Sequence, residues 1–489
     1  MTDGSLLPAG LVSLPLAAAI AAFLWPRHGR GITLASAGLV LLAAVALVVR
    51  VHQGGAWTVE LGGWAIPLGI GWTVDGLSAG MLLLTAAVAS AGGVFHARSR
   101  GAPGCDSEHF WPLWLFLWGC LNALFLSADL FNLYVTLEFA AIASVGLIGL
   151  AGDAARAAAW RYLLATLLGS SIYLLGVALL YGRHATLDIA LLSTLAEADT
   201  VTAVAALLVT LGLLLKAAIF PLHFWLPAAH GRATPAVSAI LSGVVVAAAY
   251  YLLLRLWLGP FALLLDSGAG LLLGMLGAGA VVWGGIQALL QRHLKLLVAY
   301  STIAQLGYVL ILFPLLTTPA AVQAGHGAAL LLLGHGLAKA ALFLAAGALV
   351  VHHGHDRLHA LTAAAGTRTA WAAFALAAAS LVGLPPTAGF VGKWWAAQAA
   401  LDTGALPWVL VLVTGTLLTA AYLWRPLQAA AQSATQPATE PAARVPQPAA
   451  KPVAALAWSA LALAAAALAL GLSAPLAEGL LHQRAEPGT

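Results

Sequence analysis

The sequence is poor in charged residues. Asp, Glu, Lys and Arg make up 8% of its 489 residues, against roughly a quarter in an ordinary soluble protein, and 62% of the residues are hydrophobic. Few soluble folds bury that much apolar surface, whereas a lipid bilayer accommodates it. The net charge of +4 is small and carries no basic stripe, so we expect no nucleic-acid partner.

Cysteine is equally scarce. The two cysteines, Cys105 and Cys120, form neither a CxxC pair nor a Cys/His cluster, and the sequence has no P-loop and no GxGxxG following a strand pattern. These absences argue against an iron–sulfur centre, a disulfide framework and a nucleotide site. We therefore expect no cofactor and no redox chemistry within this chain, which disfavours a quinone- or nucleotide-binding redox enzyme. Membership of an oxidoreductase complex stays open.

Long apolar segments are abundant. A helix that crosses a bilayer needs about 20 apolar residues, and this criterion predicts about fourteen spans in the chain. They lie near 5–25, 32–51, 76–96, 110–128, 130–150, 157–181, 201–227, 234–258, 267–290, 295–316, 324–351, 370–402, 406–425 and 453–475. The first span lacks a preceding positive region, so it is predicted to be a retained helix and not a cleaved signal.

Three segments between the spans have other patterns. Residues 52–75 alternate and contain Gly and Pro, which predicts an extended loop or a short hairpin outside the membrane. Residues 184–200 are too polar to span. Residues 427–452, rich in Ala, Gln and Pro, are predicted to be a disordered linker before the last helix.

The cationic residues indicate the orientation. Cytoplasmic loops carry an excess of Lys and Arg, so the richer side is predicted to be cytoplasmic, with both termini outside. Fourteen of the 21 cations fall on that side: Arg27, Arg30, Arg98, Arg100, Arg156, Arg161, Arg232, Arg292, Lys295, Arg357, Arg368, Arg425, Arg444 and Lys451. Four fall on the other: Arg50, Arg183, Arg255 and Arg484.

The three remaining cations, Lys216, Lys339 and Lys393, fall inside apolar spans, and Glu138 is the carboxylate that sits well inside one. A lysine at the centre of a membrane helix costs about 2.5–3.5 kcal/mol on insertion scales. Such residues normally mark an ion pathway or a buried pair. We therefore interpret these four side chains as candidates for proton transfer.

Two of the lysines adjoin predicted helix breaks. Lys216 precedes FPLHFWLP (220–227), and Lys393 follows GLPPTAGF (383–390). Each proline removes a backbone donor, and a broken helix is tolerated in a membrane where the freed backbone lines a polar cavity or is buried in protein. In transporters, breaks of this kind commonly adjoin the ion site.

The third lysine has a histidine neighbour. His335 precedes Lys339 by four residues, which puts both on one helix face. Low-dielectric surroundings disfavour a charged lysine, and a nearby carboxylate restores the charge. If Glu138 moves away from Lys216, or if the next lysine becomes charged, a proton can be expelled. The pattern predicts a hydrated proton relay with Glu138 and Lys216 as its electrostatic trigger.

Other interpretations of these residues stay open. Glu138 could satisfy a neighbouring polar group, and His335 with Lys339 could form a packing contact between helices. His223 could act in a relay or cap a freed carbonyl. Lys295 is expected to mark the cytoplasmic end of its helix. The histidine-rich stretch VVHHGHDRLH (350–359) lacks supporting Cys or carboxylate clusters, so we expect no metal site there.

Five stretches resemble a known family. They are KAAIFPLHFWLPAAHGRATPAVSAILSG (216–243), HLKLLVAYSTIAQLGYVLI (293–311), HGLAKAALFLAAG (335–347), GLPPTAGFVGKWWA (383–396) and LYVTLEF (133–139). They are similar to the signature stretches of the antiporter-like, proton-conducting subunits shared by complex I and the Mrp-type cation/proton antiporters.

The resemblance implies an all-α polytopic membrane fold of about fourteen helices, with two inverted five-helix repeats and discontinuous seventh and twelfth helices. The expected division is 1–109 for the first three helices with an external loop, 110–258 and 259–426 for the two repeats, 427–452 for the cytoplasmic linker, and 453–489 for the last helix and tail.

The resemblance also implies roles for the intramembrane residues. Glu138 and Lys216 match the coupling pair, His335 and Lys339 the central relay, and Lys393 the terminal proton donor or acceptor. Many members carry a lysine in the eighth helix, where this chain reads SGVVVAAAYYLLLRL (242–256). The link between half-channels is therefore expected to depend on water, His223 or His230.

The implied function is proton translocation within a larger complex of the bacterial inner membrane, of Mrp type or of complex I and hydrogenase type. Expected partners are other membrane subunits, lipid and protons, with Na⁺ or K⁺ as candidate exchanged ions. Two alternatives are a self-sufficient cation/proton exchanger and a subunit that energises bicarbonate uptake. An inert membrane scaffold is disfavoured because it would not need buried ionisable residues.

Overall fold

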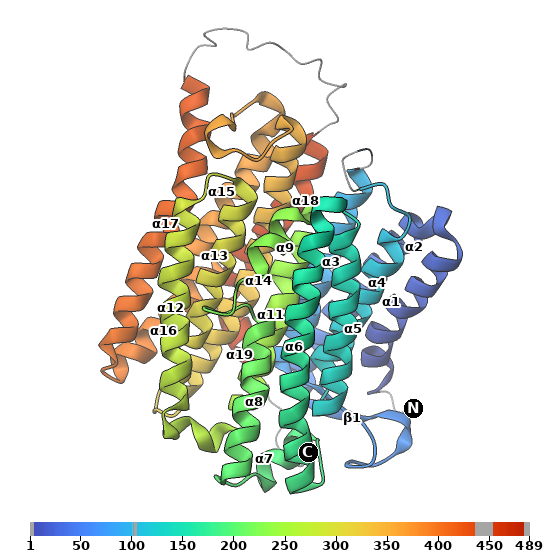
Figure 1. Ribbon diagram of the computed structural model, residues 1–489, viewed down its shortest axis with the longest axis vertical. Coiled ribbons are helices and arrows are strands. Elements are labelled where there is room, and N and C mark those ends of the chain that lie inside the picture. Colours follow the sequence, from blue (N-terminus) through green and yellow to red (C-terminus); the bar gives the residue numbers. More distant parts are fainter. Residues whose placement is uncertain (1–3, 100, 102–104, 436–452, 484–489) are drawn as a thin grey trace.

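The computed structural model describes residues 4–99, 101, 105–435 and 453–483. These residues form a bundle of helices that run mostly along one axis, with a small hairpin at one end (Figure 1). Eleven of the described helices are long and apolar enough to cross a membrane, and three more are apolar but shorter. The predicted all-α polytopic fold is therefore confirmed.

The first part of the chain forms α1 (Leu6–Leu24), α2 (Gly29–Gly54), β1 (Trp57–Glu60), β2 (Gly71–Val74), α3 (Gly76–Arg98), α4 (Phe110–Leu126), α5 (Leu130–Gly149), α6 (Asp153–His184), α7 (Ile189–Leu195), α8 (Thr200–Lys216), α9 (Leu226–Arg232), α10 (Pro235–Ile240) and α11 (Val246–Trp257). The rest forms α12 (Ala269–Leu290), α13 (Leu294–Leu310), α14 (Ala321–His353), α15 (Arg368–Val382), α16 (Ala388–Asp402), α17 (Leu406–Thr435), α18 (Val453–Leu472) and α19 (Ala474–Leu481).

The outer surface of the bundle is apolar. Large hydrophobic side chains such as Leu42, Leu164 and Leu410 are exposed on the long helices. In water these side chains would form a large and unfavourable apolar surface, whereas in a bilayer they contact apolar lipid tails. The exposed leucines thus identify the surface that faces the bilayer.

Helix α14 forms the centre. Every residue from Ala324 to Leu349 is buried, because α3, α10, α13, α15, α16 and α18 all pack around this helix. Small residues allow these close contacts; a Cβ added at Gly336 would lie 2.6 Å from the carbonyl oxygen of Gly243. Two of the candidate residues, His335 and Lys339, therefore lie in the interior of the protein.

The two ends of the bundle differ. At one end, which we call the hairpin end, β1 pairs antiparallel with β2, and Trp72 forms a bridge to Ser127. The Gly76 N–H donates to the Gln483 carbonyl there at 2.8 Å. At the opposite end, which we call the loop end, the Leu294 N–H donates to the Asp356 carbonyl at 2.8 Å.

The span predicted near 234–258 is present as Pro235–Trp257, and within it a π-helical turn, Leu241–Val245, lies between α10 and α11. One predicted boundary needs correction. Residues 427–435 were expected in the linker, but they continue α17 as far as Thr435. Ala and Gln, which favour helix, make up most of residues 427–435. The remainder of the predicted linker, 436–452, lies outside the described residues.

A buried ion pair joins α3 to α11 at the hairpin end. The two guanidinium nitrogens of Arg255 donate to the two carboxylate oxygens of Asp75 at 2.5 and 2.7 Å. The Asp75 side chain is only 3% exposed. Its carboxylate also accepts from the Ser78 N–H at 2.9 Å and so caps α3.

We expect Arg255→Ala to destabilise the protein by about 3–5 kcal/mol, because it leaves the Asp75 carboxylate buried without its cation. The measurement is unfolding of the full-length chain in lipid nanodiscs. Arg183→Ala is the matched control, since Arg183 pairs with Glu197 and Asp199 at the same end but is 43% exposed. Equal losses in the two variants would contradict this account.

Candidate functional site

The first helix break lies between α8 and α9. Helix α8 ends at Lys216, and Ala218 takes a left-handed conformation with φ of +50°. The Trp225 indole N–H donates to the Leu215 carbonyl at 3.0 Å, so one carbonyl freed by the break finds a partner. Because tryptophan provides this donor, the Lys216 ammonium is available for a different contact.

That contact is with Glu138. The Lys216 ammonium donates to a carboxylate oxygen of Glu138 at 3.1 Å, and the Ser170 hydroxyl donates to the same oxygen. The two charged side chains are 7% and 14% exposed. Three helices, α5, α6 and α8, therefore meet at one buried ion pair, and removing either partner would leave an uncompensated charge in an apolar interior.

A small cavity adjoins this pair. It has a volume of about 20 Å³, and its lining includes Lys216, Tyr162 and Thr166. The lining also includes Val245 of the π-helical turn and Ala249 of α11. A cavity of this size holds about one water molecule, and the lysine with the two hydroxyls supplies polar partners for it. The Glu138–Lys216 pair thus adjoins the helix that lacks a lysine.

The π-helical turn contributes a hydroxyl contact. Ser242 lies in this turn, and its hydroxyl is 2.8 Å from that of Thr302 on α13. The turn packs closely on α14, since a Cβ added at Gly243 would lie 2.7 Å from the Gly336 carbonyl oxygen. Single π turns of this kind are frequent at functional sites. Ser242 therefore links the eighth predicted span to α13.

Lys339 turns toward α13. Its side chain is fully buried, and its ammonium donates to the Val298 carbonyl at 3.1 Å and to the Ser301 hydroxyl. His335 lies one turn earlier in α14 and is also buried. Within the described residues, neither ring nitrogen of His335 has a hydrogen-bond partner. A buried imidazole of this kind needs water or a mobile proton partner to offset its burial.

A polar stripe runs along α13 from Lys339 toward α17. Ser301, Gln305 and Tyr308 follow one another at helical spacing and so share one face. The Gln305 amide donates to the Thr419 hydroxyl at 3.0 Å and to the Tyr422 hydroxyl at 3.3 Å. Hydroxyl and amide groups therefore occupy the interface between α13 and α17, where apolar packing would otherwise be expected.

Lys393 lies at the far end of this stripe. Its ammonium is 4.5 Å from the centre of the Tyr308 ring, and it donates to the Thr416 hydroxyl at 3.3 Å. It also donates to the Leu381 and Val382 carbonyls at 2.9 and 3.1 Å. These are the last carbonyls of α15, which the break before α16 has freed, and the negative end of a helix favours a cation.

His223 makes its contacts with aromatic side chains and not with Lys216 or Lys339. The Trp283 indole N–H donates to its Nε2 at 3.3 Å, and the Phe220 ring stacks on it with centroids 5.8 Å apart. Both partners are half-buried or exposed groups at the α12 side of the break. The structure therefore does not bring His223 into hydrogen-bonding contact with Glu138, Lys216 or Lys339.

His230 and Lys295 lie deeper than sequence reasoning indicates. His230 is fully buried beside Phe343, and neither ring nitrogen has a hydrogen-bond partner within the described residues. The Lys295 ammonium donates to the Gly231 and Ala233 carbonyls at 3.2 and 2.5 Å and so caps the C-terminal end of α9.

Larger cavities lie near the two ends of the bundle. The one at the loop end has a volume of about 490 Å³ and is lined by Arg161, Arg232, His293 and Asp356, among others. One at the hairpin end has a volume of about 560 Å³ and is lined by Asp75, Asp188, Arg255 and His326, among others. Each end therefore has a recess whose lining includes charged side chains.

Sequence reasoning identified the buried charges but not most of the polar groups between them. Ser170, Ser242, Thr302, Thr419 and Tyr422 carry no recognisable motif. Ser301, Gln305 and Tyr308 are recognisable in the sequence from their helical spacing, since three polar residues on one face of an apolar span are unusual.

The comparisons with known proteins agree with this geometry. Residues 127–419 match the transmembrane family described as NADH:quinone oxidoreductase/Mrp antiporter. The chain is 34% identical to NADH-quinone oxidoreductase subunit N of Desulforudis audaxviator, over 87% of this chain and 86% of that protein. It is 31% identical to a Na(+)/H(+) antiporter subunit of Alkalihalophilus pseudofirmus, over 73% of this chain and 72% of that protein.

A solved structure is similar over almost the whole length. A chain of the Mrp complex from Dietzia sp. superposes with a TM-score of 0.86 at 29% identity, and the match covers 99% of this chain and 97% of that one. The sequence and fold comparisons therefore agree. The chain is a multi-pass membrane protein that belongs to the NADH:quinone oxidoreductase/Mrp antiporter family of antiporter-like subunits.

Proposed function

We propose that the chain is a proton-translocating subunit of a multisubunit membrane complex, either a Mrp-type cation/proton antiporter or a complex of complex I and hydrogenase type. The observation that carries the proposal is the buried Glu138–Lys216 pair beside an interrupted helix, with its 3.1 Å contact. Relatives named as subunits of both kinds of complex support this class of function.

The fold proposed for this function has fourteen crossings. Eleven long helices and three shorter apolar ones supply that number. In each proposed repeat, three helices precede an interrupted one and a fifth follows: α4, α5, α6, α8–α9 and α10–α11 in the first, and α12, α13, α14, α15–α16 and α17 in the second. Because α4 ends at the hairpin end, whereas α12 begins at that end after a short connection from α11, whose Arg255 contacts Asp75 there, the order supports two repeats of inverted direction.

The proposed division of the chain follows from these repeats. Residues 1–109 hold the first three helices with the external loop, 110–258 and 259–426 form the repeats, and 453–489 hold the last helix and tail. The loop end faces the cytoplasm of a bacterial inner membrane, since Arg161, Arg232 and Arg357 lie there, and both termini lie outside. The linker within 427–452 is then cytoplasmic.

The trigger consists of the Glu138–Lys216 pair. While the carboxylate is close, it holds the lysine in its charged form. A displacement of Glu138 removes that stabilisation, and burial then favours the neutral amine, so Lys216 releases its proton. The Ser170 hydroxyl, which donates to the same carboxylate oxygen, keeps Glu138 stabilised and gives it a second partner in the separated state.

The link from Lys216 to Lys339 depends on water and hydroxyls in place of a lysine. The small cavity beside Lys216 reaches Val245 of the π-helical turn, and Ser242 of that turn contacts Thr302. Thr302 adjoins Ser301, which holds the Lys339 ammonium. His335 and His230 lie beside this route as imidazoles able to take and return a proton.

The second half of the route is better provided with polar groups. From Lys339 the proposed route follows Ser301, Gln305 and Tyr308; Gln305 is hydrogen-bonded to Thr419 and Tyr422, and water bridges the gaps that these side chains leave. Lys393 receives the proton next to the freed carbonyls of α15. His223 is proposed only as a side contributor at the first break, because its contacts are with Phe220 and Trp283.

We expect Glu138→Gln and Lys216→Met each to reduce coupled proton flux by about 100-fold or more, the lower end of what a proton-transferring side chain contributes. Flux is measured in vesicles that contain the complete complex, with assembly checked by size-exclusion chromatography. Glu197→Gln is the control, because Glu197 is an exposed carboxylate at the hairpin end. Wild-type flux in both assembled variants would overturn the trigger.

We expect Gln305→Leu to lower proton flux about tenfold, because a lost relay hydrogen bond of roughly 1–1.5 kcal/mol corresponds to that change in rate. Tyr300→Phe is the matched control on the same helix, since Tyr300 packs against the apolar core away from the stripe. If both variants conduct equally well, the stripe on α13 is not part of the pathway.

A further inference from the structure

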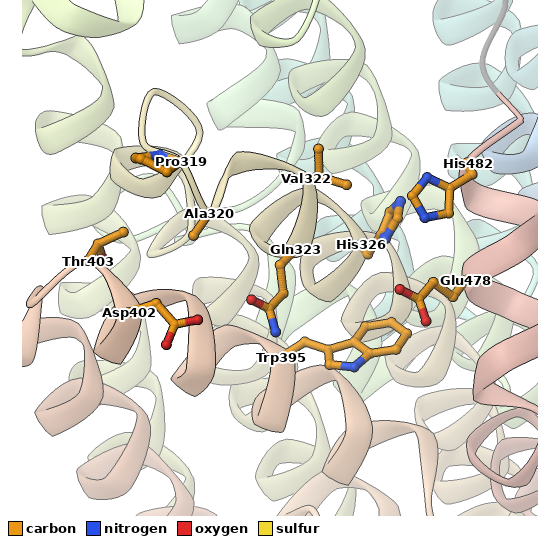
Figure 2. A pocket seen from close by; sticks show the side chains of 10 residues that line it. All are labelled: Pro319, Ala320, Val322, Gln323, His326, Trp395, Asp402, Thr403, Glu478 and His482. Atoms are coloured by element: carbon orange, nitrogen blue, oxygen red, sulfur yellow. The ribbon is translucent and has the colours of Figure 1, made fainter.

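A cluster of metal-ligating side chains lies outside the proton route. His326 comes from the first turns of α14, and Glu478 and His482 come from α19 and the residue that follows it. One potential ligand atom from each lies within 4.8 Å of the others. Figure 2 shows the two imidazoles and the carboxylate gathered on one side of a cavity.

We propose that His326, Glu478 and His482 form a binding site for a divalent transition-metal ion of the zinc class. Two imidazole nitrogens and one carboxylate oxygen are a ligand set that Zn²⁺ and its neighbours prefer. Mg²⁺, Ca²⁺ and the alkali cations prefer oxygen ligands, so the site is not built for Na⁺ or K⁺. It is therefore distinct from any transported cation.

The placement of the ligands suits this role. Glu478 and His482 are four residues apart, which brings them to one side of α19, while His326 is buried and faces them from α14. The rings of His326 and His482 lie edge to face with centroids 4.3 Å apart. Ligands of a tetrahedral Zn²⁺ lie about 3.3 Å from one another, given metal–ligand distances near 2.0 Å. The exposed His482 and half-buried Glu478 have room for this small adjustment.

The cavity beside the cluster supplies the remaining features. Its volume is about 440 Å³, which leaves space for a water molecule as a fourth ligand. Two carboxylates, Glu478 and Asp402, are among the residues that line it, and those residues include no Lys or Arg. In Figure 2, Asp402 and Gln323 lie across the cavity from the cluster. The local charge therefore favours a cation.

A bound ion would join two elements that are far apart in sequence. It would tie the C-terminal helix α19 to α14, the central helix that carries His335 and Lys339, at the hairpin end. Because binding to the folded state alone adds to its stability, the metal should hold α19 in place.

The test uses the untagged full-length chain within its complex in lipid nanodiscs, titrated with ZnCl₂ and separately with CoCl₂. We expect one Zn²⁺ per chain, a higher thermal unfolding midpoint, and the visible absorption of four- or five-coordinate Co²⁺. Glu478→Gln and His482→Ala should each weaken Zn²⁺ binding by about 100-fold or more, since even outer partners of metal ligands are worth about 10- to 100-fold.

Asp402→Asn is the matched control, because Asp402 lines the same cavity without belonging to the cluster. It should keep the stoichiometry and the cobalt spectrum. Both ligand substitutions lie at the surface, so size-exclusion profiles should match the wild type. Equal Zn²⁺ affinity in the wild type and both ligand variants, or a six-coordinate cobalt spectrum, would overturn the site. These readouts do not use proton flux and so are independent of the proposed function.

Discussion

The structure depends on one constraint: a polar group inside a membrane protein must find its partner within the protein or in enclosed water. Each helix break frees carbonyl groups, and in this chain positively polarised donors meet them. The Trp225 indole N–H donates to the Leu215 carbonyl, and the Lys393 ammonium donates to the carbonyls of Leu381 and Val382. The breaks are therefore stable features, and they fix where intramembrane charge can be held.

The two breaks distribute their charges differently. At the second break the lysine caps the helix end itself, and its charge is stabilised by carbonyl dipoles. At the first break tryptophan does this, and Lys216 is paired with Glu138. A charge held by fixed backbone dipoles responds little to a neighbouring side chain, whereas one held by a carboxylate responds strongly. In the proposed mechanism this difference makes the first break the trigger and the second break the terminus.

The spans, the breaks and the buried charges could be predicted from the sequence because each has a local signal. The spans are marked by long apolar segments, the breaks by prolines, and the buried charges by ionisable residues, which are rare in membrane helices. Sequence reasoning missed the π-helical turn at Leu241–Val245 and the helical continuation to Thr435, since neither has a local signature as strong as proline. It also could not indicate that His230 is buried beside Phe343 while His223 contacts Phe220 and Trp283. The direction of a buried imidazole depends on which helices pack around it, as Phe343 does around His230, and one sequence does not contain that information.

The eighth predicted span shows how a relay can operate without a lysine there. The cavity of about 20 Å³ beside Lys216 has room for about one water, and this span contributes only Val245, Ala248 and Ala249 to its lining. A lysine in this span would place a permanent proton-transferring group in the cavity. With small apolar side chains there instead, only a water molecule can transfer the proton. Water enters an apolar gap more readily when a charge stands beside it, since the charge orients and stabilises it. In the proposed relay the charge on Lys216 therefore controls both the proton and the wetting of the path ahead of it, so conduction across the first half stops whenever Lys216 is neutral.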